Sequence, residues 1–441
     1  MRRIVDIHHF TPSTAYFCIL IYLVVSYDYD SSRMNRKERK EQPLLNPLAA
    51  LLSLPESEKN SRGLLHTPRE IFQQPETWLT TLDRLSATRA SLVEFLEGFI
   101  HADQNGLRPE IILTGAGTSD YIGRAVSRIL RRRWSCEVSA VPSTELLTNL
   151  DDFVRPERKY LLISFSRSGE SSEGVALLEQ TLDRYPRQIR HLLITCNEGG
   201  SMAKFPGIFR LILDPRVNDR GLAMTSSFSN MVIAGQYLAF AETPELFEPL
   251  VKELVEIGSQ KMAETAEITA NLAIKRFSRV CFLGTGALRA IAEESALKVL
   301  ELNSGRIATL AESALGLRHG PLSFVNDETL VVAYLSGEEQ RQGYELDLLE
   351  EMKEKHLGAE TLIVAPHATG RADRITKSVL TLDAPKDFPD FCLPAVDVIA
   401  GQLLGLFFAI ENGITPDSPS TGAISRVVSS IKIYSPAVGK I

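Results

Sequence analysis

Short apolar runs alternate with longer amphipathic stretches along most of the chain. Residues 111–113, 160–165 and 191–195 are mainly apolar, which is typical of strands buried on both faces. The stretches that follow the first two, which include residues 123–133 and 172–185, have apolar positions at helical spacing. Buried strands separated by helices predict a parallel sheet covered by helices on both faces.

The same pattern returns further along the chain. Residues 280–287 repeat the strand and glycine turn of residues 111–118, 169 positions later. Residues 329–334 and 361–365 repeat the second and third strands at offsets of 169 and 170. Three matching strands at a near-constant offset indicate an internal duplication. We therefore predict an α/β fold made of two tandem, doubly wound parallel-sheet domains.

The segments outside the repeats complete the domain organisation. Residues 67–105 have apolar positions at helical spacing and predict a helical lead-in, and residues 242–276 predict a long helical connector. We expect three parts: an N-terminal extension (residues 1–64), the lead-in with the first domain (65–250), and the connector with the second domain and the C-terminal tail (251–441).

The N-terminal extension differs from the rest of the chain. The apolar run of residues 15–25 resembles a signal-peptide core, but it is too short to span a bilayer, which takes about 20 residues. No small-residue cleavage site follows it, and Met34 opens a polar stretch that suits a cytosolic start. Three interpretations stay open: a reading frame that truly begins at Met34, which we favour, a targeting or anchor segment, or an extra helix. We expect residues 1–64 to be disordered or a gene-model artefact, and we expect no membrane association.

Composition excludes several classes of protein. The net charge of -7 gives no electrostatic reason to expect nucleic acid as a partner. The five cysteines are odd in number and scattered, which argues against a disulfide scaffold and favours the cytoplasm. The histidines are equally dispersed, so we expect no metal site. A small anionic substrate would therefore need a local cradle of backbone amides and hydroxyls.

Two loops are candidates for that cradle. The glycine turn at residues 115–119 follows the first strand, but such a turn is as often only a tight connection. Residues 164–172 place five serines and Gly169 between a strand and a helix, where free N–H groups attract anions. An ordinary N-cap explains one or two hydroxyls and not five. We predict that a phosphate binds to Ser166, Arg167, Ser168, Ser171 and Ser172. The equivalent residues 334–338 have lost this run of serines, so only the first half is expected to hold the phosphate.

Together these loops resemble the signature of SIS domains, the sugar isomerase fold, over about residues 65–441. The resemblance implies that Ser119 also holds the phosphate. It implies catalytic roles in the second half: Glu301 as the base, Lys298 stabilising developing charge, and His319 opening the sugar ring. Lys298 and Glu301 are three residues apart, and spacing alone also fits a simple salt bridge. Further sugar contacts are expected from Gly117, Thr118, Thr225, Ser226, Arg318 and Arg426.

Within the SIS proteins, residues 141–149, 219–227 and 415–419 look like the AgaS type, the galactosamine-6-phosphate deaminase/isomerases also described as tagatose-6-phosphate ketose/aldose isomerases. Arg426 stands where glucosamine-6-phosphate synthase has a lysine, and an arginine cannot readily form a Schiff base. The resemblance implies acid–base chemistry on an amino-sugar phosphate without metal or organic cofactor, in a cytoplasmic homodimer. An isomerase or deglycase acting on another hexose 6-phosphate, and a non-catalytic sugar-phosphate sensor, stay open as alternatives. The sugar epimer also stays open.

Overall fold

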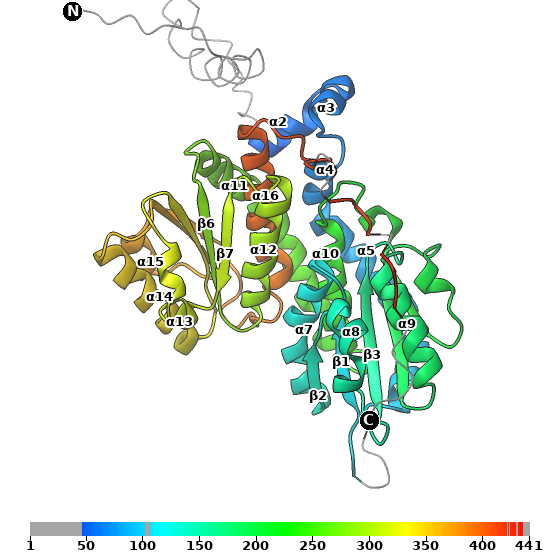
Figure 1. Cartoon of the computed structure of the whole chain (residues 1–441). Helices are drawn as coiled ribbons and strands as arrows, with labels where there is room; N and C mark the ends of the chain where they lie inside the picture. Colours follow the sequence, from blue (N-terminus) through cyan, green and yellow to red (C-terminus); the bar gives the residue numbers. More distant parts are fainter. Residues whose placement is uncertain (1–45, 102–105, 421, 423, 429–430, 435–441) are drawn as a thin grey trace, which may run out of the picture.

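The computed structural model describes residues 46–101, 106–420, 422, 424–428 and 431–434. These residues form two α/β halves that lie side by side, with a group of helices between and above them (Figure 1). The apolar run at residues 15–25 and Met34 lie outside the described residues.

The first half contains a parallel sheet of five strands. Its order is β2-β1-β3-β4-β5, so the chain starts in the sheet interior and reverses direction once. β3 is buried along its whole length, as its apolar sequence predicts. The strands are β1 (Glu110–Thr114), β2 (Glu137–Ala140), β3 (Tyr160–Ser166), β4 (Ile189–Thr195) and β5 (Phe209–Ile212).

The second half repeats this sheet. Its order is β7-β6-β8-β9-β10, and all of its pairs are parallel. The order of strands matches that of the first half, so the predicted fold of two tandem parallel-sheet domains is confirmed. The strands are β6 (Arg279–Gly284), β7 (Ala308–Glu312), β8 (Thr329–Tyr334), β9 (Glu360–Ala365) and β10 (Ser378–Thr381).

Helices cover both sheets. Those of the first half are α7 (Thr118–Trp134), α8 (Ser143–Phe153), α9 (Ser172–Arg184) and α10 (Ser226–Leu238). Those of the second half are α12 (Leu288–Leu302), α13 (Ala314–Leu317), α14 (Glu339–Glu354), α15 (Gly370–Ile375) and α16 (Pro394–Glu411). Four single-turn 3-10 helices lie in the connections, at Ser201–Lys204, Pro215–Val217, Pro244–Leu246 and Pro321–Phe324.

The lead-in and the connector are helical, as predicted. The lead-in forms α4 (Thr67–Phe72), α5 (Gln74–Ala87) and α6 (Arg89–Glu97), and the connector forms α11 (Glu248–Ala273). The predicted disorder is wrong for the end of the extension, which forms α2 (Pro47–Ser53) and α3 (Glu56–Arg62). Asn46 caps α2, and Leu48 and Leu51 are buried where α2 packs against α11. Apolar burial and a capped helix start explain this order.

α16 is the most apolar helix of the second half. It is the one helix among the described residues that is long and apolar enough to cross a membrane, but nearly all of it is buried inside the protein. It packs against α10, α11 and α12. Its composition is therefore accounted for by its place in the core.

The contact between α16 and α12 depends on small residues. A Cβ at Gly401 would lie 2.4 Å from the Cβ of Ser295, too close for two carbon atoms. We predict that Gly401→Ala lowers the free energy of unfolding by about 1–3 kcal/mol, because it overpacks this contact. Urea unfolding of the purified protein measures the change.

Gly343→Ala is the matched control. This position lies in α14, and an added Cβ meets nothing within 4 Å. The substitution should leave stability unchanged or raise it slightly, because alanine favours a helix. Equal losses of stability in the two variants would contradict the proposed close packing.

Candidate functional site

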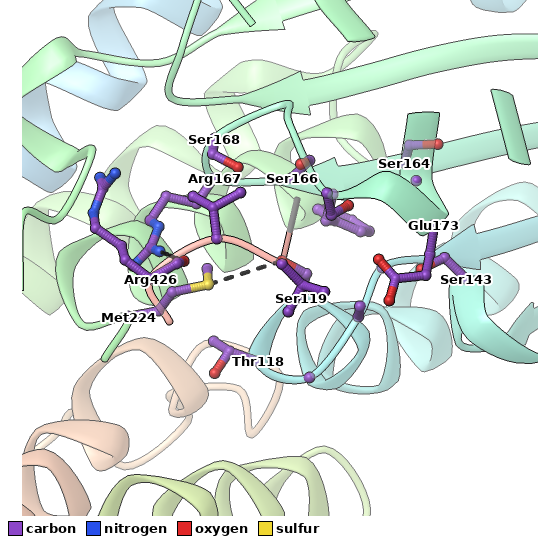
Figure 2. A pocket seen from close by; sticks show the side chains of 18 of the residues that line it. Thr118, Ser119, Ser143, Ser164, Ser166, Arg167, Ser168, Glu173, Met224 and Arg426 are labelled. Carbon is purple, nitrogen blue, oxygen red and sulfur yellow. Dashed lines mark hydrogen bonds between the residues drawn. The ribbon is translucent and has the colours of Figure 1, made fainter. Parts of the chain in front are cut away.

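The carboxyl ends of the strands in the first sheet open into a cavity of about 460 Å³ (Figure 2). This is the edge of a doubly wound sheet at which ligands bind. The cavity joins both predicted loops to a residue from the second half, Glu301. The predicted site residues that line it are Gly117, Thr118, Ser119, Ser166, Arg167, Ser168, Ser171, Glu301 and Arg426.

The serine loop holds its own shape through its hydroxyls. Ser166 Oγ accepts a hydrogen bond from the Gly169 N–H at 3.0 Å, and Ser168 Oγ accepts one from the Glu170 N–H at 3.2 Å. Gly169 has φ +65°, and a Cβ there would lie 3.3 Å from the Cα of Gly200. The loop therefore curls tightly around the start of α9, which is the geometry that suits an anion.

Glu170 connects this loop to Ser201. Its carboxylate accepts hydrogen bonds from the N–H and the hydroxyl of Ser201, at 2.8 and 2.7 Å. Across the cavity, Ser119 lies in the first turn of α7, and its hydroxyl is 3.9 Å from the sulfur of Met224. The Ser119 hydroxyl therefore lies at the cavity surface beside the loop.

A C-terminal segment, residues 424–428, forms one wall of the cavity. The buried guanidinium of Arg167 donates to the carbonyls of Leu222 and Arg426. The N–H of Ser172, the first residue of α9, donates to the carbonyl of Val428 at 3.0 Å. Ser172 itself does not line the cavity, whereas Arg167 both lines the cavity and holds the C-terminal segment.

Arg426 is fastened in turn to the loop before α10. Its guanidinium donates to the carbonyl of Asp219 and to the side chain of Asn218, both at 2.8 Å. The cavity therefore contains Arg426 at the position where glucosamine-6-phosphate synthase has a lysine. The guanidinium of Arg426 is held by these oxygen acceptors.

Thr225 and Ser226 do not line the cavity, although the resemblance implies sugar contacts for both. The carboxylate of Asp219 accepts hydrogen bonds from their backbone N–H groups, at 2.8 and 3.0 Å, and so caps α10. The Thr225 hydroxyl also donates to Asp219, and the Ser226 hydroxyl donates to the carbonyl of Glu70. Both hydroxyls are completely buried. Their part in the structure is to hold the loop that carries Met224.

Lys298 lies between the two halves and is completely buried. Its ammonium donates to Glu301 at 2.6 Å and to the hydroxyl of Thr118, in the first half, at 3.0 Å. Glu294 completes the group, with its carboxyl 3.3 Å from Lys298 and also 3.3 Å from Thr118. The predicted Lys298–Glu301 pair therefore exists, and its ammonium is inside the protein rather than on the surface.

Burial and charge set the protonation of this group. Burial raises the pKa of Glu294 to about 8, although Lys298 opposes the shift. Burial alone lowers the pKa of Lys298, but the neighbouring carboxylates outweigh it and raise that pKa. At neutral pH the group therefore holds a neutral Glu294 and a charged Lys298. The side chain of Glu301 reaches the cavity.

His319 and Arg318 lie outside the cavity. Both are exposed, and they follow the short helix α13 of the second half. Arg318 forms a salt bridge with Glu351 at 2.8 Å. The structure therefore does not bring these two residues to the loops of the same chain.

The equivalent loop of the second half is occupied by the protein's own carboxylates. Glu345 accepts from the N–H of Ser336 at 2.8 Å, and Asp390 accepts from the N–H of Gly337 at 2.7 Å. Arg341 forms a salt bridge with Asp390 at 2.9 Å. The N–H groups of Ser336 and Gly337, in the loop equivalent to the one predicted to bind phosphate, are thus capped by carboxylates of the protein itself.

Several residues of the site were not predicted from the sequence. Glu173, Ser143, Met224 and Leu222 line the cavity, and Glu294 touches Lys298. Glu294 lies four residues before Lys298, so helical spacing could have indicated it. Glu173 and Ser143 carry no such signal, because only the packing of α8 and α9 brings them to the cavity.

The raised pKa of Glu294 predicts a dependence of stability on pH. The native state binds an extra proton between pH 4.5 and about 8, so the free energy of unfolding falls as pH rises through this range. We predict that Glu294→Gln removes a part of that fall on the order of 3 kcal/mol. Urea unfolding at pH 5 and 8.5 measures it. Glu179→Gln, an exposed site on α9, should keep the wild-type slope, and an unchanged slope in Glu294→Gln would contradict the assignment.

Known proteins with similar sequences and structures indicate the family of this chain. The SIS domain family model matches residues 108–241. The chain is 34% identical over 375 residues to D-galactosamine-6-phosphate deaminase AgaS of Escherichia coli, covering 83% of this chain and 95% of that protein.

Two solved structures are similar over most of their length. A candidate tagatose-6-phosphate ketose/aldose isomerase from Clostridium novyi has a TM-score of 0.83 and 29% identity, covering 87% of this chain and 99% of that one. The tagatose-6-phosphate ketose/aldose isomerase of Escherichia coli has a TM-score of 0.74 and 32% identity, covering 84% and 96%. The chain belongs to the AgaS family of SIS domain proteins.

Proposed function

We propose that the protein converts galactosamine-6-phosphate to tagatose-6-phosphate and ammonia. The observation that carries the proposal is the cavity, which brings the serine loop of one half to Glu301 of the other, with Lys298 buried behind it and bonded to it. The similarity to an AgaS deaminase over nearly the whole of that protein supports the same substrate.

The serine loop binds the phosphate on C6. Ser166, Ser168 and Ser171 line the cavity beside the start of α9, and Ser119 adds a hydroxyl from α7. Fixing one end of the sugar makes the later proton transfers effectively intramolecular. The rest of the sugar then extends toward Glu301.

Glu301 moves the proton between C2 and C1. It removes the proton from C2 of the open-chain amino aldose and returns one to C1, which leaves an imine at C2. Water adds to the imine, ammonia leaves, and the ketose phosphate remains. Lys298, held 2.6 Å from Glu301, balances negative charge that develops during the transfer.

Ring opening comes before these steps and needs a group that moves a proton to the ring oxygen. His319 is the proposed group, and because it lies outside the cavity of its own chain, it acts from a second copy. This assignment requires that two copies of the chain associate, as a homodimer. We also place the reaction in the cytoplasm, and the four described cysteines, all free and buried, suit a reducing compartment.

Isomerisation without deamination is the second candidate, because the similar solved structure from Escherichia coli is described as a ketose/aldose isomerase. One assay separates the two. The purified full chain is incubated with galactosamine-6-phosphate, glucosamine-6-phosphate or tagatose-6-phosphate, and ammonia and ketose are measured. Ammonia from galactosamine-6-phosphate supports the proposal, and release from neither amino sugar overturns it.

Replacing the base tests its role. We predict that Glu301→Gln lowers kcat by about 10²–10⁴, the usual contribution of a general base. The KM should stay within a few-fold, because the amide can still accept a hydrogen bond from Lys298. Steady-state ammonia release measures both constants, and full turnover by Glu301→Gln would reject this assignment.

Replacing a loop serine tests phosphate binding. We predict that Ser168→Ala raises KM about 5–30-fold, because it removes a hydroxyl from the cavity and loosens the Glu170 N–H. Ser336→Ala changes the equivalent loop of the second half and should leave KM unchanged. An unchanged KM in Ser168→Ala would contradict the phosphate role.

A further inference from the structure

One part of the cavity is lined by four oxygen-bearing side chains that bond to no other described residue: Thr114, Ser143, Ser164 and Glu173. The three hydroxyl residues are more than nine-tenths buried, at 2%, 3% and 7% exposed. Thr114 Oγ1 and Glu173 Oε2 are buried atoms without a hydrogen-bond partner among the described residues. Buried polar groups are nearly always paired, so a ligand or bound water is expected at these side chains.

The fold brings these side chains to one face of the sheet. Thr114 and Ser164 are register partners on the adjacent strands β1 and β3, so their side chains lie on the same face. Ile112 and Leu162, two residues earlier on each strand, pack with the α8 and α9 side of the core. The hydroxyls of Thr114 and Ser164 therefore point toward α8 and α9.

Those two helices supply the other members. Ser143 is the first residue of α8, and its N–H donates to the carbonyl of Gly115 at 2.8 Å, beside the end of β1. Glu173 lies in the first turn of α9, four residues before Leu177, which packs in the same core cluster. Figure 2 shows Glu173 and Ser143 on the opposite side of Ser119 from Met224 and Arg426.

The charges in the cavity call for a cation. The lining residues include two guanidinium groups, Arg167 and Arg426, and two carboxylates, Glu173 and Glu301. Lys298 pairs with Glu301 behind the lining, so before a phosphate dianion binds, Glu173 is the one lining carboxylate without an ion pair among the described residues. Glu173 and that phosphate also share the positive end of one helix, α9, so the carboxylate repels the phosphate unless a cation lies between them.

We propose that Thr114, Ser143, Ser164 and Glu173 bind a monovalent cation of the size of potassium or ammonium beside the phosphate loop. The inference rests on the phosphate loop of the proposed function. One carboxylate with neutral hydroxyls suits a single positive charge, whereas calcium and magnesium sites depend on more carboxylates or on ordered water. Among the described residues no group of three or more His, Cys, Asp or Glu side chains could hold a metal ion. Ammonium, with four N–H donors, is also the product of the proposed reaction.

Binding of inorganic phosphate in different salts tests this site. Titration calorimetry compares the chlorides of potassium, ammonium and tetramethylammonium, a much larger cation without N–H donors, at equal ionic strength. We expect the phosphate Kd to be at least about fivefold lower with potassium or ammonium, the size of an ordinary coupling between two sites. Glu173→Gln should abolish the difference, and Thr114→Val, which removes only a hydroxyl, should reduce it.

Matched controls make each outcome decisive. Glu179→Gln makes the same charge change at an exposed position of α9 and should keep the wild-type difference. Thermal melting checks that each variant is folded. An effect of both ions supports a general cation site, and an effect of ammonium alone supports a site for the product. Equal phosphate affinity in all three salts, or a difference that persists in Glu173→Gln, overturns the proposal.

The same titrations separate this proposal from the proposed function. If phosphate binds in no salt, the loop assignment and the cation site both fail. If phosphate binding depends on the cation but galactosamine-6-phosphate is not converted, the cation site stands and the proposed reaction fails. If the reaction proceeds and phosphate affinity is the same in every salt, only the cation site fails.

Discussion

The arrangement of the two halves depends on one buried charge, the ammonium of Lys298. It is completely enclosed, and its partners are Thr118 from the first half and Glu294 and Glu301 from its own helix. Removing a partner from a buried ion pair typically costs about 3–5 kcal/mol. α12 must therefore stay against the glycine turn before α7. The position of Glu301 relative to the serine loop follows from this constraint.

Other contacts also hold α12 and the loops around the cavity in place. α16 lies close to α12 because Gly401 leaves room for Ser295, and α11 supports α16 from the other side. On the first half, Asp219 caps α10 and holds the loop that carries Met224 into the cavity. Rigid helices on one side and a capped loop on the other keep the cavity in a fixed shape, which is what acid–base chemistry at a sugar requires.

The inner strands and the serine loop could be predicted from the sequence, each for a physical reason. The inner strands are continuous apolar runs, so β1, β3, β4 and their repeats were predicted within a few residues. The edge strands β2, β5, β7 and β10 have only four or five residues and are less apolar, so the pattern did not show them. The serine loop was predicted because its chemistry lies in consecutive residues.

The residues that the sequence did not predict come together only through tertiary packing. Glu173 and Ser143 belong to different helices, and the C-terminal segment reaches the cavity from more than 250 residues beyond the loop that it contacts. His319 is the opposite case. Its motif resembles that of the family and predicts a site residue, but in the single chain His319 is exposed and lies outside the cavity. A motif identifies a residue type in a loop, but it does not fix where that loop lies.

The internally capped loop of the second half has a consequence for how the gene could change. Asp390 and Glu345 hold the amides of Ser336 and Gly337, and the first half has no counterpart of the Lys298 group in its sequence. In the proposed function, each half therefore supplies a different part of the site. Separating the halves, or exchanging one with a distant relative, transfers half a reaction, so the two must be inherited and must diverge as a pair.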